Sequence, residues 1–423
     1  MDVLALGKQA KTAARALAKA TTQQKNDALE AMAVALEIHA DRILEANQRD
    51  LDMAKARGTQ DALLDRLSLQ GRLTRIIADV RTVIALPDPV GTTFDERTLD
   101  NGLHIHRRTT PIGVIGVIYE NRPNVTVDVA AITLKSGNAA ILRGGSETLY
   151  SNLALVDAIH AGLQKYGALP LDSIQIIGDT DRQHVVTMLK MHDSIDMIIP
   201  RGGAALHQFC RENSMIPVIT GGVGICHLYI DETADLDLAI PVIHNAKTSR
   251  PSVCNSLDTV LVHANIAAAL LPRVVTALAA DGVTFRAEPR AKSVLDAAAL
   301  NGSAESVHAA GDDDFSTEWM ALILGLKVVD SLDEAVDHIQ AHSLNHSDGI
   351  ITRNMEHAAQ FINEVDSAAV FVNASTRFND GGALGLGAEV AVSTQKLHAR
   401  GPMALEALTT YKWVVMGEGH IRQ

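Results

Sequence analysis

The most chemically suggestive feature of this sequence is a cysteine in a turn that also carries positive charge. Cys254 lies in the run of residues 245–255 with Lys247 and Arg250, and Pro251 restricts the backbone just before it. Thiolate is the nucleophilic form of cysteine, and nearby cations favour it. The run predicts a nucleophilic Cys254, although on its own an unpaired cysteine more often packs as a small buried hydrophobe.

Three glycine pairs predict a nucleotide-binding edge. Each follows a short apolar run, in the order Arg143-Gly144-Gly145-Ser146, Arg201-Gly202-Gly203 and Thr220-Gly221-Gly222. Glycine lets the backbone approach a phosphate closely, and the N-terminus of a following helix favours negative charge. A GxGxxG pattern is absent from these turns, so a conventional Rossmann mode of binding is not expected.

The segments around these glycines alternate between strand and helix patterns. Apolar runs predict strands at residues 112–119, 139–142, 174–177, 195–199 and 217–220. A helix is expected to begin at Pro123 and to stop at Gly137. Further strands are predicted after Cys254, at residues 259–262, 326–329 and 369–372. Such alternation predicts parallel sheets that bind ligands at the carboxyl ends of their strands.

Helices and a hairpin complete the predicted elements. Alanine-rich helices are expected in residues 1 to about 60, with Thr21 and Gln24 as a capping box. Asn101-Gly102 predicts a type I′ turn. His104 and His106 then share one strand face, where a metal pair is conceivable. Without cysteine or carboxylate ligands nearby, an ordinary strand face is favoured and no metal site is predicted.

Composition limits the class of protein. A chain of 423 residues with 47% hydrophobic residues predicts two or more folded domains. A net charge of -13 and 3% aromatic residues argue against nucleic-acid or anionic-membrane partners. No signal segment is recognised, and no apolar stretch approaches the ~20 residues that cross a bilayer. Three widely spaced cysteines favour reduced thiols, so a cytoplasmic protein is expected.

Longer collinear blocks carry a resemblance that covers essentially the whole chain. They are residues 117–125, 135–138, 143–147, 245–248, 253–255, 372–381, 385–389 and 397–402. In these blocks the chain resembles the gamma-glutamyl phosphate reductases, a family of the aldehyde dehydrogenase superfamily. The resemblance implies two parallel-sheet α/β domains and a small β oligomerisation element. It places an NADP-binding domain at 1–97 and 113–245, a catalytic domain at 246–400, and the oligomerisation element at 98–112 and 401–423.

The resemblance also implies an activity. It is the NADPH-dependent reduction of L-glutamate 5-phosphate to L-glutamate 5-semialdehyde, with release of phosphate, through a thioester on Cys254. This reaction belongs to proline biosynthesis, so functional coupling to glutamate 5-kinase is expected. The strand-based element implies a homo-oligomer.

Roles for individual residues follow from the same resemblance. Cys254 is the implied nucleophile, and Asn121 is the implied side-chain donor to the oxyanion. Two alternatives stay open: that Asn124 is the donor, and that Asn121 is a simple turn residue. Glu318 is implied to bind the nicotinamide-side ribose, or else to be a helix-start charge. Substrate phosphate and carboxylate are expected to meet Lys247, Arg250, Ser375, Thr376 and Arg377. The cofactor is expected to meet Arg143, Gly144, Gly145, Ser146, Arg201, Gly202, Gly203, Gly221 and Gly222.

One departure from the superfamily pattern is informative. Hydrolytic aldehyde dehydrogenases place a glutamate before the glycine pair that here is Gly221-Gly222, and this chain has Thr220. Loss of that base suits an enzyme that keeps its thioester from water. Two alternatives stay open: a thioester-forming dehydrogenase with another acyl donor such as coenzyme A, and a non-catalytic nucleotide-binding or assembly protein.

Overall fold

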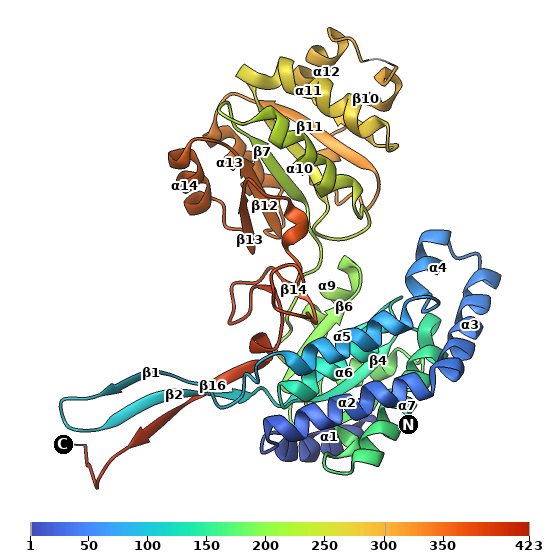
Figure 1. The fold of residues 1–423 in the computed structure, drawn as a ribbon, viewed down its shortest axis with the longest axis vertical. Helices are drawn as coiled ribbons and strands as arrows, with labels where there is room; N and C mark the ends of the chain where they lie inside the picture. The colour runs from blue at the N-terminus through green and yellow to red at the C-terminus, as the bar shows by residue number, and fades with distance from the viewer. Residues whose placement is uncertain (1, 301, 423) are drawn as a thin grey trace. The chain divides into compact units, whose positions relative to one another are not determined.

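Two compact units make up the chain. The computed structural model describes residues 2–300 and 302–422. The first unit comprises Met1–Thr220, Gly385–Ala391 and Pro402–Gln423, and the second comprises Gly221–Leu384 and Val392–Gly401. Figure 1 labels their helices and strands, and each unit is described by itself below.

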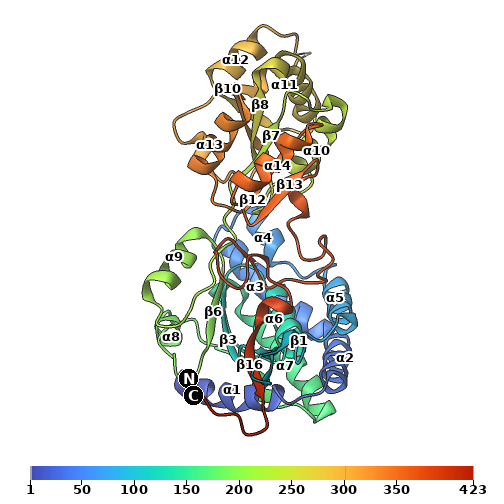
Figure 2. The same ribbon diagram turned by 90° about the vertical axis from the view of Figure 1, so that its left-hand side faces the viewer.

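A four-stranded parallel sheet forms the centre of the first unit, in the order β5-β4-β3-β6. Its strands are β3 (Val114–Tyr119), β4 (Ala139–Gly144), β5 (Ile174–Ile176) and β6 (Met197–Arg201). Strand β3 is buried along its whole length, which explains why apolar residues fill it. The accompanying helices are α6 (Asn124–Lys135), α7 (Leu149–Tyr166), α8 (Gln183–Met188) and α9 (Ala204–Asn213), and α9 packs beside β6 (Figure 2).

The N-terminal helices pack against this layer. They are α1 (Val3–Leu17), α2 (Thr22–Ile38), α3 (Ala40–Ala56), α4 (Asp61–Leu67) and α5 (Leu73–Ala85). The predicted capping box is confirmed, because the Thr21 hydroxyl accepts from the Gln24 N–H and the Gln24 side chain accepts from the Thr21 N–H. Leu29 and Met32 of α2 are fully buried, and α2 packs on α7. These helices are scaffold for the sheet.

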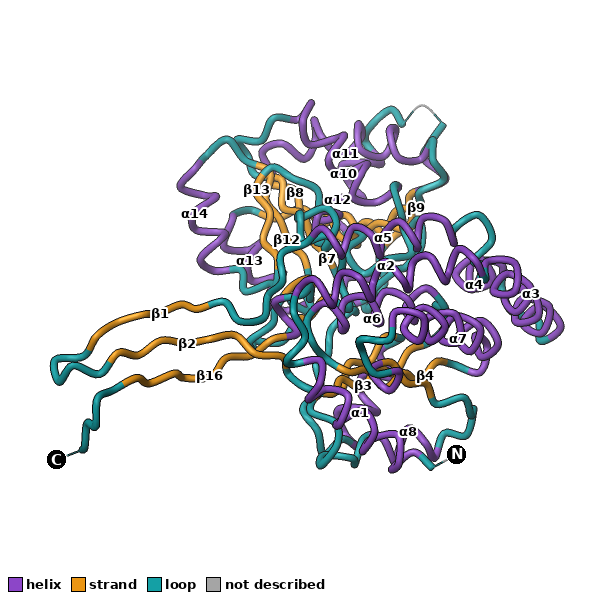
Figure 3. Tube along the Cα trace, turned by 60° about the horizontal axis from the view of Figure 1, so that its bottom comes forward, coloured by secondary structure: helices purple, strands orange, loops and turns teal. Residues whose placement is uncertain are grey.

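A three-stranded antiparallel arm completes the first unit. It consists of β1 (Thr93–Thr98), β2 (His104–Pro111) and β16 (Thr409–Met416), in the order β1-β2-β16. Figure 3 shows the three strands running side by side, away from the helices of this unit. The predicted type I′ turn is wrong, because Gly102 has φ +87° whereas Asn101 is not in the positive-φ region. The Gly102 N–H instead donates to the Leu99 carbonyl at 2.8 Å, in a longer hairpin loop.

A seven-stranded parallel sheet forms the centre of the second unit, in the order β10-β9-β11-β8-β7-β12-β13. Its strands are β7 (Cys226–Ile230), β8 (Leu257–His263), β9 (Thr284–Ala287), β10 (Val307–Ala309), β11 (Ile323–Val329), β12 (Ser347–Ile351) and β13 (Ala369–Val372). Its helices are α10 (Leu236–Thr248), α11 (Ala264–Ala279), α12 (Pro289–Asp296), α13 (Leu332–His342) and α14 (Met355–Glu364). Two short strands, β14 (Val392–Ser393) and β15 (Gly401–Pro402), follow later in the chain.

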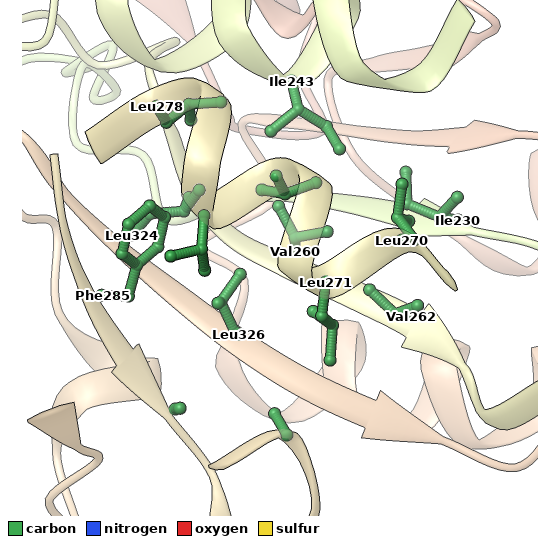
Figure 4. Packing of buried hydrophobic residues seen from close by; sticks show 14 of the residues in the cluster. Ile230, Ile243, Val260, Val262, Leu270, Leu271, Leu278, Phe285, Leu324 and Leu326 are labelled. Atoms are coloured by element: carbon green, nitrogen blue, oxygen red, sulfur yellow. The ribbon is translucent and has the colours of Figure 1, made fainter. Parts of the chain in front are cut away.

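Apolar side chains cover both faces of this sheet. On one face, Val260 and Leu326 of the strands pack with Leu271 of α11 (Figure 4). On the other face, Leu261 packs with Phe361 of α14. Full burial of one such side chain stabilises the fold by roughly 1.5–3 kcal/mol. The two clusters thus hold β8, and the turn before it, in a rigid layer.

The two expected parallel-sheet α/β units are confirmed, with two differences in detail. Residues 217–220 form no strand of their own, and Val218 makes only an isolated bridge to Ile198. The compact units divide between residues 220 and 221, whereas the sequence analysis placed the boundary between 245 and 246. The difference arises because β7 pairs with β8 and β12, so its segment belongs to the second sheet.

Candidate active site

Cys254 lies in the turn between α10 and β8. The helix ends at Thr248 and the strand begins at Leu257. The Cys254 side chain is half-buried, Cys210 and Cys226 are buried, and none of the three forms a disulfide. Burial raises the pKa of Cys210 to about 11 and raises the pKa of Cys226 well above its ordinary value. Cys254 is therefore the cysteine that a solvent-borne substrate can reach.

Neighbouring groups fix the main chain of this turn. The Cys226 thiol donates to the Cys254 carbonyl oxygen at 3.2 Å. Gly224 lies against the same oxygen, since a Cβ added to Gly224 would be 2.1 Å from it. On the other side, the Thr376 hydroxyl donates to the Asn255 carbonyl oxygen at 2.8 Å. The backbone that presents the thiol is thus held by two separate segments of the second unit.

Arg377 brings a guanidinium to the same turn from a short 3-10 helix, η5 (Thr376–Phe378). Its Nε donates to Ser249 Oγ at 3.2 Å, and its Nη1 donates to Asn255 Oδ1. Ser375 caps this helix by accepting from the Arg377 N–H at 3.3 Å. Ser375 and Thr376 therefore shape the segment, whereas Arg377 extends from it to the nucleophile turn.

Two cations share this region. Burial lowers the pKa of Arg377, Asp380 raises it, and Arg250 lowers it again because two like charges are close. Cys254 also raises the pKa of Arg377, which places the thiol within the same local field. Among the described residues, no carboxylate lies within ion-pairing distance of the Arg377 or Arg250 guanidinium. Anions near Cys254 would meet both positive charges.

The structure corrects the expected role of Lys247. Its side chain is completely buried, its Nζ donates to the Leu257 carbonyl at 2.8 Å, and it lies 3.7 Å from Asp258 Oδ1. Burial lowers the pKa of Lys247 and raises the pKa of Asp258 to about 6. A substrate anion cannot reach this ammonium, so Lys247 supports the turn from inside the fold.

Glu318 is joined to the nucleophile turn through a glycine. Its Oε1 accepts from the Gly224 N–H at 3.0 Å. The following N–H, that of Trp319, donates to Asp258 Oδ1 at 3.2 Å. Asp258 Oδ2 accepts from the Cys226 N–H at 3.2 Å. Asp258 thus anchors both the segment that carries Glu318 and the strand that supports Cys254.

The first unit collects the other predicted residues at one edge of its sheet. In the strand register, Tyr119 of β3 lies opposite Gly144 of β4 and Arg201 of β6. The parallel strands therefore end together, and the residues at and just after their carboxyl ends share the edge. These residues are Asn121, Arg143, Gly144, Gly145, Ser146, Arg201, Gly202 and Gly203. Their grouping was expected from the sequence.

Arg143 is held by the main chain at this edge. It is 8% exposed, its Nη1 donates to the Gly144 carbonyl at 2.8 Å, and its Nη2 donates to the Thr180 carbonyl at 2.9 Å. Burial lowers the pKa of Arg143. Its Nε is buried without a partner in the described structure, and so is the Nε of Arg201. Both arginines thus keep one unused donor at the strand ends.

Carboxylates that the sequence analysis missed lie beside the glycines. Glu120 accepts from the Gly203 N–H at 3.3 Å, and a Cβ on Gly202 would approach its Oε2 to 2.3 Å. Glu147 accepts from the Asn121 N–H at 3.3 Å, and a Cβ on Gly145 would approach its Oε1 to 2.2 Å. The amides at this edge therefore receive oxygen acceptors, and either carboxylate end would have to shift to admit a side chain in place of its glycine.

Asn121 and Asn124 differ in their surroundings. Asn121 adopts φ +50°, a left-handed conformation that asparagine tolerates better than most residues. The Asn124 side chain donates to Asp128 Oδ2 at 2.8 Å within α6. Burial raises the pKa of Asp128 to about 6. The Asn124 amide is thus engaged inside its own helix, which favours Asn121 as the available amide donor.

The third glycine pair is shaped by a close contact. A Cβ on Gly221 would lie 2.0 Å from the Val392 carbonyl oxygen, and Gly221 forms a bridge with Ser393. Gly222 adopts φ +82°, which favours glycine. Packing of the chain therefore accounts for both glycines in the second unit, independently of any cofactor.

No cluster of three or more metal-ligating side chains occurs within residues 2–300 and 302–422. His104 of the arm instead pairs with Glu96, with Nε2 and Oε1 2.8 Å apart. The described helices include none with the length and apolar character of a membrane span.

Comparison with known proteins identifies the family. The aldehyde dehydrogenase family model matches residues 1–301. The gamma-glutamyl phosphate reductase of Roseiflexus castenholzii is 55% identical over 420 residues, covering 99% of this chain and 98% of that protein. The chain belongs to the gamma-glutamyl phosphate reductases of the aldehyde dehydrogenase family. The Vibrio vulnificus member is 55% identical over 415 residues, covering 98% of each. The crystal structure of the Thermotoga maritima member matches with a TM-score of 0.95 at 44% identity, covering 100% of both chains.

Three residues that support the nucleophile turn could not be picked out from the sequence. Gly224, Asn255 and Asp258 contact the nucleophile turn, but none of them forms a motif by its own spacing. The one available signal was adjacency, since Asn255 and Asp258 follow Cys254 closely. Their partners in segments 318–319 and 376–379 lie more than sixty positions away along the chain.

Proposed function

We propose that this chain reduces L-glutamate 5-phosphate with NADPH to L-glutamate 5-semialdehyde and phosphate, as a step of proline biosynthesis. The observation that carries the proposal is the half-buried Cys254 in the field of two cations that have no carboxylate ion-pair partner among the described residues. Its full-length relatives are named for the same substrate class. An acyl phosphate is an anion with an electrophilic carbon, and this turn offers a nucleophile and positive charge together.

Cys254 carries the covalent step. Its thiolate sulfur bonds to the acyl carbon of the substrate, giving a tetrahedral oxyanion. The bond from that carbon to the phosphate oxygen then breaks, phosphate leaves, and a thioester remains on Cys254. After reduction, the carbon–sulfur bond breaks, the semialdehyde is released and the thiolate returns. The Cys254 N–H is the proposed main-chain donor to the oxyanion. The Asn121 amide keeps the donor role that the family resemblance implies for it.

Arg250 and Arg377 hold the substrate anion in this account. Arg377 is fixed by Ser249 and Asn255, so its guanidinium is oriented before substrate arrives. Such preorganisation strengthens charge-assisted hydrogen bonds to phosphate or carboxylate. Ser375 and Thr376 act through the backbone of η5.

NADPH is assigned to the glycine-lined strand ends of the first unit, and Glu318 of the second unit keeps the ribose-binding role that the family resemblance implies. The fit rests on the orphaned Nε atoms of Arg143 and Arg201 and on the glycines at which a side chain would collide. When bound, NADPH supplies the hydride that reduces the thioester. The chain's own part is to present main-chain N–H groups, arginine donors and the Glu318 carboxylate to a dinucleotide.

The β1-β2-β16 arm is proposed to join copies of the chain. Tyr411 and Trp413 are 46% and 48% exposed, and Val415 is 58% exposed. Exposed aromatic and aliphatic side chains on one sheet mark an association surface. A homo-oligomer is therefore proposed, and a solution mass equal to one chain would contradict it. We also propose that it works in the cytoplasm, where three cysteines without disulfides are stable.

A coupled assay tests the proposed activity. Glutamate 5-kinase, ATP, glutamate and NADPH are mixed with this protein, and NADPH absorbance is followed. Functional coupling to the kinase is expected because acyl phosphates are labile. NADPH consumption that requires both the kinase and this protein supports the proposal. Consumption with an acyl-coenzyme A in place of the kinase system would instead favour a coenzyme A-dependent dehydrogenase.

A further inference from the structure

Asn255, the residue after the nucleophile, has an unusually complete set of contacts. It is 5% exposed. Its Nδ2 donates to the Asn379 carbonyl at 3.1 Å and to the Arg377 carbonyl at 3.4 Å. Its Oδ1 accepts from Arg377 Nη1, and its carbonyl oxygen accepts from the Thr376 hydroxyl. The Asn255 side chain therefore forms hydrogen bonds with both the backbone and the guanidinium of Arg377.

The hydrogen bonds between Asn255 and Arg377 join two segments that are 122 positions apart in the sequence. Asn379 connects these hydrogen bonds to the sheet, because its Nδ2 donates to the His346 carbonyl and to Ser347 Oγ at the start of β12. Within residues 2–300 and 302–422, the other side chain that accepts a hydrogen bond from the Arg377 guanidinium is the exposed Ser249. The position of the guanidinium therefore depends on both Asn255 and Ser249, with the larger share from the buried Asn255.

We infer that Asn255 is a positioning residue that aims the Arg377 guanidinium at the phosphate group of the acyl phosphate. This inference rests on the proposed function. In the substrate, phosphate is bonded to the carbon that Cys254 attacks, whereas the α-carboxylate is separated from that carbon by the rest of the chain. A guanidinium fixed on the residue next to Cys254, and in the field of its thiol, is placed for the nearer group. Arg250, which is exposed, supplies a second positive charge close enough to lower the pKa of Arg377.

The test uses the reverse reaction, in which L-glutamate 5-semialdehyde, NADP and inorganic phosphate are the substrates. Asn255→Ala should raise the KM for phosphate by at least about tenfold and leave the KM for semialdehyde within about twofold. Arg377→Ala should do the same. In the double variant, Asn255→Ala should add nothing further, because it acts through Arg377. Asn245→Ala, an exposed asparagine in the same run, is the matched control and should behave like the parent protein.

Three outcomes would overturn the inference. One is an Asn255→Ala effect that adds in full to that of Arg377→Ala, and another is an equal rise in both KM values; either indicates a general structural role. The third concerns Ser249→Ala, an exposed change that serves if Asn255→Ala does not fold. It removes the other guanidinium contact and should raise the phosphate KM selectively, by about two- to fivefold, and no change would contradict the inference. If the parent protein oxidises semialdehyde without phosphate, the proposed function itself fails, and that result is separate from all of these.

Discussion

Glu318 accepts a hydrogen bond from the main-chain N–H of Gly224 at 3.0 Å. Gly224 in turn lies against the carbonyl oxygen of Cys254, where no side chain fits. The carboxylate proposed to meet the cofactor and the backbone of the proposed nucleophile are thus joined through one glycine. This link makes the position of the thiol sensitive to small changes in the segment before β7.

Gly224→Ala is expected to lower turnover strongly. Its Cβ would come to 2.1 Å from the Cys254 oxygen and 2.9 Å from the His346 ring, so the turn must move. Overpacking of this kind costs about 1–3 kcal/mol, and a barrier change of the same size is roughly five- to 150-fold in rate. Gly311→Ala is the matched control, because its Cβ would find only an ordinary contact at 3.8 Å. Steady-state rates and thermal unfolding of both variants check this, and near-parental turnover in Gly224→Ala would contradict the account.

Cys254→Ala is expected to abolish reduction while NADPH still binds. The thiol supplies the covalent step, whereas the proposed dinucleotide contacts come from other residues. Cys210→Ser, at a fully buried thiol of α9, should keep its turnover if it folds. Fluorescence titration of NADPH and the coupled assay measure the two properties separately. Retained turnover in Cys254→Ala would remove the thioester from the mechanism.

The buried Asp258 is expected to make the free energy of unfolding fall as the pH rises. Burial raises its pKa from 3.8 to about 6 in the folded protein. The folded state therefore holds this proton more tightly than the unfolded state does. Stability contributed by Asp258 is greatest below the unfolded pKa and is lost as the pH rises towards and through 6, by at most about 3 kcal/mol. Urea unfolding between pH 4 and 7 should show this loss in the parent protein relative to Asp258→Asn. Parallel stability curves would contradict the prediction.

Arg143→Ala is expected to weaken NADPH and NADH by similar factors, within about threefold of each other. Both terminal nitrogens of Arg143 already bond to the Gly144 and Thr180 carbonyls, so the side chain shapes the strand end. Titration with each cofactor measures the two affinities. A loss confined to NADPH would contradict this and show that the guanidinium leaves these carbonyls to bind the extra phosphate.

The sequence was most informative where one local pattern decides the structure. Strand β3 is a continuous apolar run, so burial on both faces followed directly from its residues. Strand β12 contains Ser347 and Asp348 and was not predicted. It is buried because two groups satisfy the Asp348 carboxylate: Ser343, five positions away, and His227, 121 positions away in the sequence. The expectation that Lys247 binds the substrate missed a similar pairing, because the buried Lys247 ammonium lies beside the Asp258 carboxylate. Pairings across the fold are invisible to spacing.

The central claim is that the thioester on Cys254 reacts readily with phosphate and only slowly with water. The residue at position 220 is the sequence feature that supports it. Hydrolytic members of the superfamily carry a glutamate at this position to activate water, and this chain has none there. Water should therefore deacylate Cys254 slowly, while phosphate held by Arg250 and Arg377 should do so readily. Arsenate should replace phosphate, because the acyl arsenate hydrolyses and draws the reaction forward.

The most direct measurement is oxidation of L-glutamate 5-semialdehyde by NADP with the parent protein, after phosphate has been removed completely. The account predicts negligible NADPH formation until phosphate or arsenate is added, and then a rate that saturates with the added anion. Fast NADPH formation without either anion would mean that an activated water reaches the thioester. The chain would then act as a hydrolytic dehydrogenase, and the acyl phosphate mechanism would be wrong.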